Sequence, residues 1–169
     1  MIKHHGELCC GVFFISFKGA DTMKNISYIK DIAKWKSEFS FYSKIKVRFS
    51  ETDMFGHMNN VSAFTYFEQA RIEFLAHIGF SLEDKDIQGV PIVADLQCDF
   101  HRQIFFDEEL KVYVKANHVG TSSIDIHYMV INPEGQVCLT GRGALVYIDV
   151  TTQKPTPIPE EMRKKLLNN

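Results

Sequence analysis

The chain has 169 residues, of which 45% are hydrophobic and 24% are charged, and its formal net charge is −2 at pH 7. This length and composition predict one globular domain with its own hydrophobic core. The charge gives no broad attraction to nucleic acid or to an anionic membrane, so we expect neither as a partner, although a small basic patch for a phosphate-bearing ligand is compatible with it.

The first 22 residues contain a mainly apolar run from Leu8 to Phe17, which has the length of a signal-peptide core. Lys18 would lie at the third position before a cleavage after Ala20, where a small residue is required, and the run is too short to span a bilayer. We therefore expect an upstream extension rather than a targeting signal, and a cytoplasmic protein.

Apolar residues between Tyr28 and Phe41 recur at a loose helical spacing, with charged residues between them. The pattern predicts a short helix that covers an edge or end of a sheet. The segment is too short and not basic enough for a DNA-binding domain. We divide the chain into an N-terminal extension with a short helix, residues 1–40, and a main domain, residues 41–169.

Residues 45–79 predict a strand, a turn and a long helix. Ile45, Val47 and Phe49 alternate with polar residues, which is typical of a strand with one buried face. From Val61 onward the apolar period changes to three and four residues, which predicts a helix with one apolar stripe. That stripe consists of Ala63, Phe64, Phe67, Ala70, Phe74, Leu75 and Ile78. Asn59 or Asn60 can cap the start of this helix, and Gly79 suits its end.

The turn before this helix concentrates the residues that can carry chemistry, and Asp53, His57 and Asn60 are our candidate catalytic residues. A helix start presents unpaired N–H donors, which stabilise a developing negative charge. Asp53 can attack a carbonyl or orient a water molecule while the amide of Asn60 or Val61 holds the carbonyl oxygen. The alternative is that Asp53 only caps the turn and His57 is a structural polar residue.

The remainder of the chain predicts four strands joined mostly by tight turns. They span Ile92–Phe106, with a bend near Arg102, then Leu110–His118, Ile124–Val130 and Val137–Val150, and a short helix follows at Glu160–Leu167. A strand, a long helix and four further strands predict the α+β class, with an antiparallel sheet that wraps one long central helix.

The run V-R-F-S-E-T-D-M-F-G-H-M-N-N, followed by a helix that carries Glu68-Gln69-Ala70-Arg71, closely resembles a known family opening. It is similar to the 4-hydroxybenzoyl-CoA thioesterase type of hotdog-fold acyl-CoA thioesterases. Residues 132–137 and 148–155 resemble the final hairpin and tail of long-chain acyl-CoA thioesterases in this group. Related plant acyl-carrier thioesterases have an Asn where this chain has Phe55, so an Asp-Asn-His set is not carried over whole.

This resemblance implies the hotdog fold and hydrolysis of acyl-CoA thioesters, with Asp53 as general base or nucleophile and no cofactor. It implies a homodimer or homotetramer that shares its active sites between subunits. It also implies that a partner strand corresponding to Gly89–Val93 lines the thioester. The turn with His118, Thr121 and Ser122 would approach the CoA phosphates, although the arginines that some relatives have there are missing.

Several alternatives remain open from the sequence. The aromatic side chains of the long helix can line a channel for a fatty or aromatic acyl group, or they can form the core. An acyl-carrier-protein thioester is a competing substrate, and a hotdog module that binds acyl-CoA without cleaving it or a hotdog hydratase are competing functions. Glu68 is more simply explained by an ion pair with Arg71, or with a partner across a dimer, than by catalysis.

Other large enzyme classes lack their motifs in this chain. It has no G-x-S-x-G elbow, P-loop, dinucleotide-binding glycine fingerprint or H-E-x-x-H pair. The four cysteines have no zinc-site spacing, and the remaining histidines have no spacing that builds a ligand set. We therefore expect reduced thiols and no metal.

Overall fold

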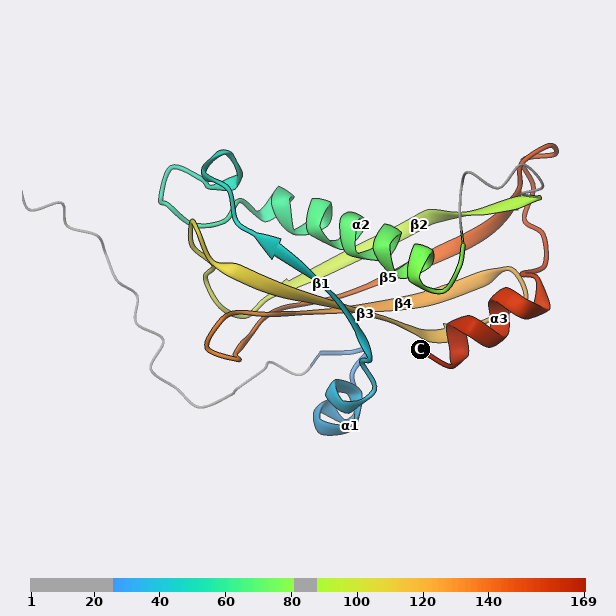
Figure 1. The fold of residues 1–169 in the computed structure, drawn as a ribbon, viewed down its shortest axis with the longest axis horizontal. Helices are drawn as coiled ribbons and strands as arrows, with labels where there is room; N and C mark the ends of the chain where they lie inside the picture. Colours follow the sequence, from blue (N-terminus) through green and yellow to red (C-terminus); the bar gives the residue numbers. More distant parts are fainter. Residues whose placement is uncertain (1–25, 81–87) are drawn as a thin grey trace, which may run out of the picture.

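The computed structural model describes residues 26–80 and 88–169 (Figure 1). Within these ranges the elements are α1 (Ile32–Ser37), β1 (Phe41–Lys46), the 3-10 helix η1 (Phe49–Glu51), α2 (Asn60–His77), β2 (Gly89–Phe100), β3 (Glu109–Val119), β4 (Ser123–Ile131), β5 (Val137–Asp149) and α3 (Glu160–Leu167). The described strands form a five-stranded sheet with antiparallel pairs in the order β1-β3-β4-β5-β2. The predicted α+β class with one long helix is confirmed, whereas the apolar run at Leu8–Phe17 lies outside the described residues.

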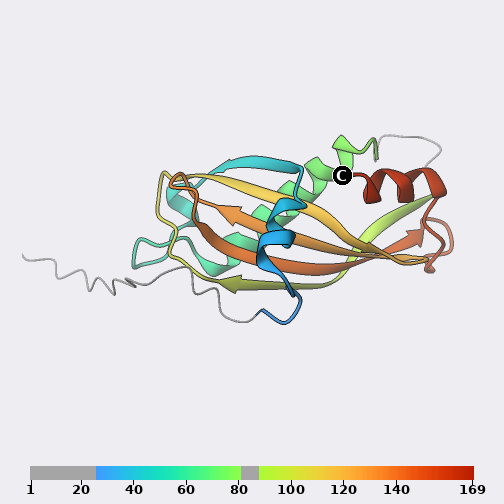
Figure 2. The ribbon, with the colours of Figure 1, turned by 90° about the horizontal axis from the view of Figure 1, so that it is seen from below.

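The two strands that flank α2 in the sequence lie at opposite edges of the sheet. β1 pairs only with β3 and β2 only with β5 among the described strands, while β3, β4 and β5 follow one another as a meander. Helix α2 lies across one face of this sheet, and α1 lies on the opposite face (Figures 1 and 2). Among the described residues, no helix has the length and apolar character needed to cross a membrane.

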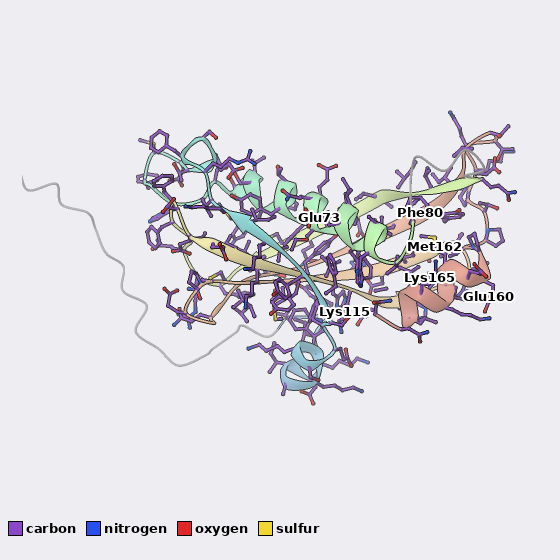
Figure 3. All side chains as sticks on the ribbon, viewed as in Figure 1. Glu73, Phe80, Lys115, Glu160, Met162 and Lys165 are labelled. Carbon is purple, nitrogen blue, oxygen red and sulfur yellow. The ribbon has the colours of Figure 1, made fainter. Side chains whose placement is uncertain are left out.

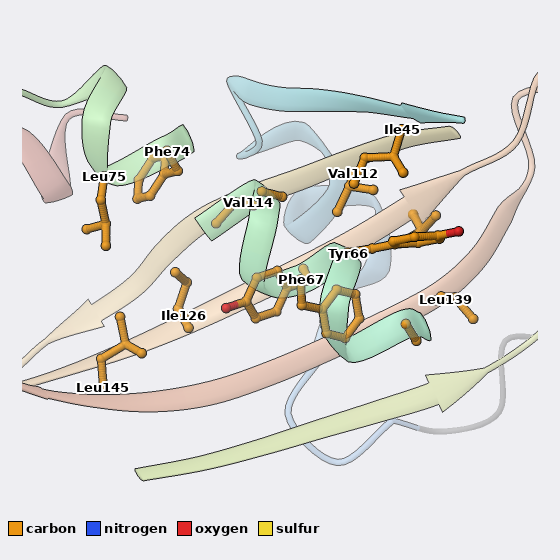
Figure 4. Packing of buried hydrophobic residues seen from close by; sticks show 14 of the residues in the cluster. Ile45, Tyr66, Phe67, Phe74, Leu75, Val112, Val114, Ile126, Leu139 and Leu145 are labelled. Atoms are coloured by element: carbon orange, nitrogen blue, oxygen red, sulfur yellow. The ribbon is translucent and has the colours of Figure 1, made fainter. Parts of the chain in front are cut away.

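The apolar stripe of α2 packs directly on the sheet (Figure 4). The Phe67 and Phe74 side chains are fully buried, and the Phe67 ring stacks on Tyr128 with ring centroids 4.4 Å apart. Gly141 permits this close approach, because a Cβ atom there would lie 2.5 Å from the Phe67 ring. The Phe67 and Phe74 rings therefore belong to the core.

Both predicted ends of the long helix are present. Asn59 is the N-cap, and its side chain accepts a hydrogen bond of 3.1 Å from the amide of Val61. Asn60 is the first helical residue instead of the cap. At the other end Gly79 has φ +82°, which favours glycine because a side chain would strain that backbone.

The strand predicted to continue through Phe49 ends earlier. Ile45 and Val47 are buried as expected, but β1 stops at Lys46, and Phe49 begins η1 with 78% of its surface exposed. The Glu51 carboxylate accepts hydrogen bonds from the Arg48 amide at 2.8 Å and from the Tyr66 hydroxyl at 2.7 Å. These bonds turn the chain away from the sheet, so the strand prediction is wrong for its last residues.

The next strand also differs from its predicted limits. It was expected over Ile92–Phe106, but β2 begins at Gly89 and ends at Phe100, and residues 101–108 connect it to β3. Its pairing with β5 shifts register between Val93 and Asp95, where a bulge interrupts the ladder. The Asp95 carboxylate accepts a 2.7 Å hydrogen bond from the Ala144 amide and anchors that irregularity.

Candidate active site

A cavity of about 750 Å³ opens at the end of the sheet where three connections meet. They are the turn after η1, the β2–β3 connection and the β4–β5 turn. Asp53, His57 and Asn60, the predicted catalytic residues, all line it. Its volume lies within the ordinary range of small-molecule sites.

Asp53 holds the turn closed through its own hydrogen bonds. Its Oδ1 accepts from the amides of Phe55 at 2.8 Å and His57 at 3.1 Å. Its backbone N–H donates to the His57 carbonyl at 2.7 Å. The turn-capping role that the sequence allowed is therefore present, in a carboxylate that also faces the cavity.

His57 connects this turn to the β2–β3 connection. Its imidazole packs edge-on against Phe105, with ring centroids 5.2 Å apart, and the two residues form an isolated β-bridge. The next residue, Met58, donates its amide to the Ile104 carbonyl at 2.7 Å. The hydrogen bonds between Asp53 and His57 involve the backbone of His57 and not its imidazole, so the placement of His57 supports a role in shaping the cavity wall.

The helix start offers one of the two expected oxyanion donors. The Val61 amide already donates to the Asn59 side chain at 3.1 Å. Asn60 lines the cavity, and no acceptor for its amide is found in the part of the chain that the structure describes. The Asn60 amide is thus the better placed donor.

Glu68 lies outside this site. Its carboxylate is 62% exposed and lies 3.9 Å from the Arg71 guanidinium, one turn further along α2. Arg71 is itself buried and donates to the Tyr128 hydroxyl at 3.2 Å. These contacts are those of a structural pair, as the simpler explanation predicted.

The cavity also contains polar residues that the sequence did not single out for function, notably His101, Arg102 and Glu108. Burial raises the pKa of the Glu108 carboxyl, the Phe105 amide lowers it, and the Glu134 charge raises it further. Its Oε2 is buried and lacks a hydrogen-bond partner among residues 26–80 and 88–169. The only sequence signal for this wall was the bend near Arg102, because a connection between strands carries no periodic pattern.

The candidate CoA ligands His118, Thr121 and Ser122 lie at the other end of the sheet. β3 runs from the cavity to their turn over 11 residues, which is roughly 33 Å. Their turn is fixed by the amides of Tyr147 and Ile158, which donate to the Ser122 and Thr121 carbonyls at 2.8 and 2.9 Å. One chain therefore does not bring them to Asp53.

The described residues contain no group of three or more His, Cys, Asp or Glu side chains arranged to hold a metal ion. The histidine and carboxylate side chains of the cavity are spread over three connections instead.

Residues 47–166 match the model of the thioesterase-like superfamily, and the chain is a member of this family. Thioester hydrolysis is the activity for which this superfamily is named. The predicted hotdog fold is confirmed.

The chain is also similar to individual proteins. The chain is 44% identical to the uncharacterized protein YsmA of Bacillus subtilis over 86% of this chain and 99% of YsmA. It is 27% identical to the long-chain acyl-CoA thioesterase FadM of Escherichia coli over 73% of this chain and 95% of FadM. A solved thioesterase from Thermus thermophilus, complexed with coenzyme A and Zn, is 30% identical with a TM-score of 0.66, over 77% of this chain and 93% of that one.

Proposed function

We propose that the protein hydrolyses acyl-CoA thioesters to the free acid and CoA. The observation that carries the proposal is that the Asp53 carboxylate and Asn60 at the helix start line the same cavity. As general base, Asp53 takes a proton from water while the water oxygen attacks the carbonyl carbon. The Asn60 amide stabilises the oxyanion. The C–S bond then breaks, and CoA leaves as the thiolate. As nucleophile, Asp53 would instead form a mixed anhydride that water cleaves.

The acyl group, fatty or aromatic, is proposed to occupy this cavity instead of a channel along α2. Phe67 and Phe74 are fully buried in the core, which leaves no room beside them for a chain. Phe100 and Phe105, which are 52% and 40% exposed, supply apolar surface to the cavity wall. Burial of methylene groups against such a wall contributes about 0.8 kcal/mol each.

A homodimer joined through β2 completes the site in this proposal. β2 is a long edge strand, and Ile92 and Val93 on it are 48% and 37% exposed, so it offers free backbone groups and apolar side chains to a partner. Pairing two β2 strands about a two-fold axis would place the partner's opposite sheet end beside Asp53. His118, Thr121 and Ser122 would then reach CoA from the second subunit.

The test is thiol release from short, long and aromatic acyl-CoAs by the purified protein and by Asp53→Asn. We expect a loss of at least a hundredfold in kcat, because an amide neither accepts the proton nor forms the anhydride. The fold should survive, since the Asn oxygen can keep the two amide contacts of the turn. The matched control is Asp31→Asn, because Asp31 caps α1 through two amides in the same way but lies outside the cavity.

Two results would contradict the proposal. Full activity of Asp53→Asn would exclude this carboxylate from the chemistry. Tight acyl-CoA binding without thiol release from the wild type would instead identify a binding module. An acyl-carrier-protein thioester is tested in parallel, and its faster cleavage would replace CoA as the carrier.

A further inference from the structure

The residues that precede β1 form a strap over the face of the sheet opposite α2. This N-terminal strap, residues 26–39, includes α1 and crosses the strands on the side shown in Figure 2. Ile26, Ile29 and Trp35 of the strap are buried with Met129 and Val137 of the sheet in a second hydrophobic cluster. The strap thus has its own small core, separate from the core under α2.

Two polar contacts fix the strap in register. The Trp35 indole donates to Nδ1 of His127 at 2.8 Å, and His127 is 1% exposed. Lys115, on the side of the sheet that carries α1 in Figure 3, forms an ion pair with Glu38 and lies over the Trp35 and Phe39 rings. A strap held in this way places its earlier residues at defined positions on the sheet.

Tyr28 of the strap reaches two strands at once. Its hydroxyl lies 2.8 Å from Oδ2 of Asp99 on β2 and 3.1 Å from Oγ1 of Thr140 on β5. The same Thr140 oxygen lies 2.9 Å from Nε2 of His101. Four side chains therefore form one continuous line from the strap to the first residue after β2.

The donors in this line have a defined direction. A tyrosine hydroxyl has one proton, and the Asp99 carboxylate is its stronger and nearer acceptor. The Thr140 hydroxyl then donates to Tyr28, and its oxygen accepts from Nε2–H of His101. The line therefore holds His101 in the Nε2–H tautomer.

His101 is the point where this line meets the candidate active site. Its side chain lines the cavity that contains Asp53, and its backbone amide donates to the Cys138 carbonyl at 2.8 Å. We propose that Tyr28 is a positioning residue of this site. It acts through Thr140 to fix the orientation and tautomer of His101 and so the cavity wall formed by residues 101–105. This inference rests on the proposed function only in its kinetic test, because the hydrogen-bonded line itself does not depend on activity.

The kinetic test is Tyr28→Phe, which removes one hydroxyl and keeps the ring. We expect KM for acyl-CoA to rise about fivefold, the ordinary contribution of one hydrogen bond, with kcat little changed because the wall positions the acyl group in ground and transition state alike. Tyr42→Phe is the control, since Tyr42 is a partly exposed residue of β1 outside the cavity. An unchanged KM in Tyr28→Phe would overturn the inference.

Variants at Thr140 test the route. Thr140→Val should reproduce the rise in KM, whereas Thr140→Ser, which keeps the hydroxyl, should have a KM close to that of the wild type. The double variant with Tyr28→Phe and Thr140→Val should have the same KM as Thr140→Val alone. Fully additive effects would contradict a shared line.

Imidazole nitrogen NMR supplies a readout that a merely structural role would not move. The wild type should show His101 with its proton on Nε2, and Tyr28→Phe should mix the tautomers; an unaltered His101 signal would exclude the proposed line. If the wild type releases no thiol at all, the proposed function fails. In that case the affinity of the Tyr28→Phe and Tyr42→Phe variants for acyl-CoA, measured by calorimetry, still decides the inference.

Discussion

The turn before α2 depends on two residues with different tasks. Asp53 supplies the acceptor that closes the turn, and Gly56 supplies a backbone conformation with φ +78°. The space around Gly56 is open, because a Cβ atom there would meet nothing within 4 Å. Only the backbone angle therefore requires glycine at this position, and any side chain would strain the loop that carries Asp53.

Replacing Gly56 by alanine should lower the free energy of unfolding by about 1 kcal/mol, since a side chain disfavours positive φ. We also expect a clear fall in kcat, because relief of the strain displaces Asp53. Urea denaturation and thiol release measure the two effects. Gly79→Ala is the matched control, because Gly79 has φ +82° at the far end of α2 and does not line the cavity. A Cβ atom there would lie 3.0 Å from the flexible end of the Lys165 side chain. The control variant should lose similar stability and keep its kcat; equal kinetic losses in both variants would contradict the specific role of Gly56.

Individual site residues could be predicted from the sequence where a local spacing rule applies. The spacing of Asp53, His57 and Asn60 placed them in one turn, and the structure brings all three to one cavity. The placement of Glu108 and His101 at the cavity could not be predicted, because it depends on contacts with residues far along the chain. His101, for example, meets Thr140 across 39 positions. No local pattern encodes such a contact.

Among the elements, α1 owes its position to tertiary contacts. It has only 6 residues and would be unstable alone, but its Trp35 binds the buried His127. Burial lowers the pKa of His127 to about 4, with Lys115 and Arg142 also lowering it and Asp125 opposing them. The Trp35 hydrogen bond needs an unprotonated Nδ1, so the docking of α1 depends on neutral His127.

This linkage predicts a loss of stability in acid. The folded-state pKa of His127 lies below its ordinary value of 6.5, so the unfolded chain binds the proton more readily. The contribution of neutral His127 to the free energy of unfolding is complete above pH 6.5 and is lost as the pH falls toward 4. Below pH 4 this contribution changes little. Its size is about 3 kcal/mol.

Urea denaturation between pH 7 and pH 4 measures this effect. His127→Gln, whose side-chain oxygen can still accept from Trp35, should flatten the dependence in that window. His118→Gln, which removes an exposed imidazole, should leave it as in the wild type. A wild-type profile that is flat from pH 7 to 4 would show that His127 is not held neutral.

The ends of the strands show where prediction from hydrophobic alternation is accurate and where it fails. Alternation located β3, β4 and β5 to within about two residues, because each has one face on the core. It failed at Phe49, where the Glu51 hydrogen bonds redirect the chain, and at the end of β2, which lies at the sheet edge. Hydrophobic patterning reports burial, and both failures occur where burial no longer follows the strand.

At the scale of the whole molecule, Asp53 lies far from His118, Thr121 and Ser122, the residues proposed to contact CoA. A single chain presents the two groups at opposite ends of β3. The sequence could not reveal this distance, because the family resemblance described a shared site without its geometry in one subunit. Activity should therefore depend on association through β2.

Substituting Ile92 by arginine should convert the proposed dimer to a monomer and lower kcat/KM at least tenfold. The residue is 48% exposed on the edge strand, so the fold of one chain should tolerate the change while a buried interface would not. Light scattering and thiol release measure the two effects. Ile32→Arg is the control, because Ile32 is 38% exposed on α1, which lies on the face of the sheet opposite α2 and not on the β2 edge strand. A fully active dimer of the Ile92→Arg variant would exclude this interface.

The order of the elements also bears on how the protein is made. Helix α2 is synthesised before strands β2 to β5, which cover its apolar face. The last of these strands, β5, ends at Asp149. At a synthesis rate of about 5–20 residues per second, that face stays uncovered for several seconds while the ribosome completes the sheet. During this interval Phe67 and Phe74 can contact other molecules in the cell. Protection by a chaperone would therefore matter most between the synthesis of α2 and that of β5.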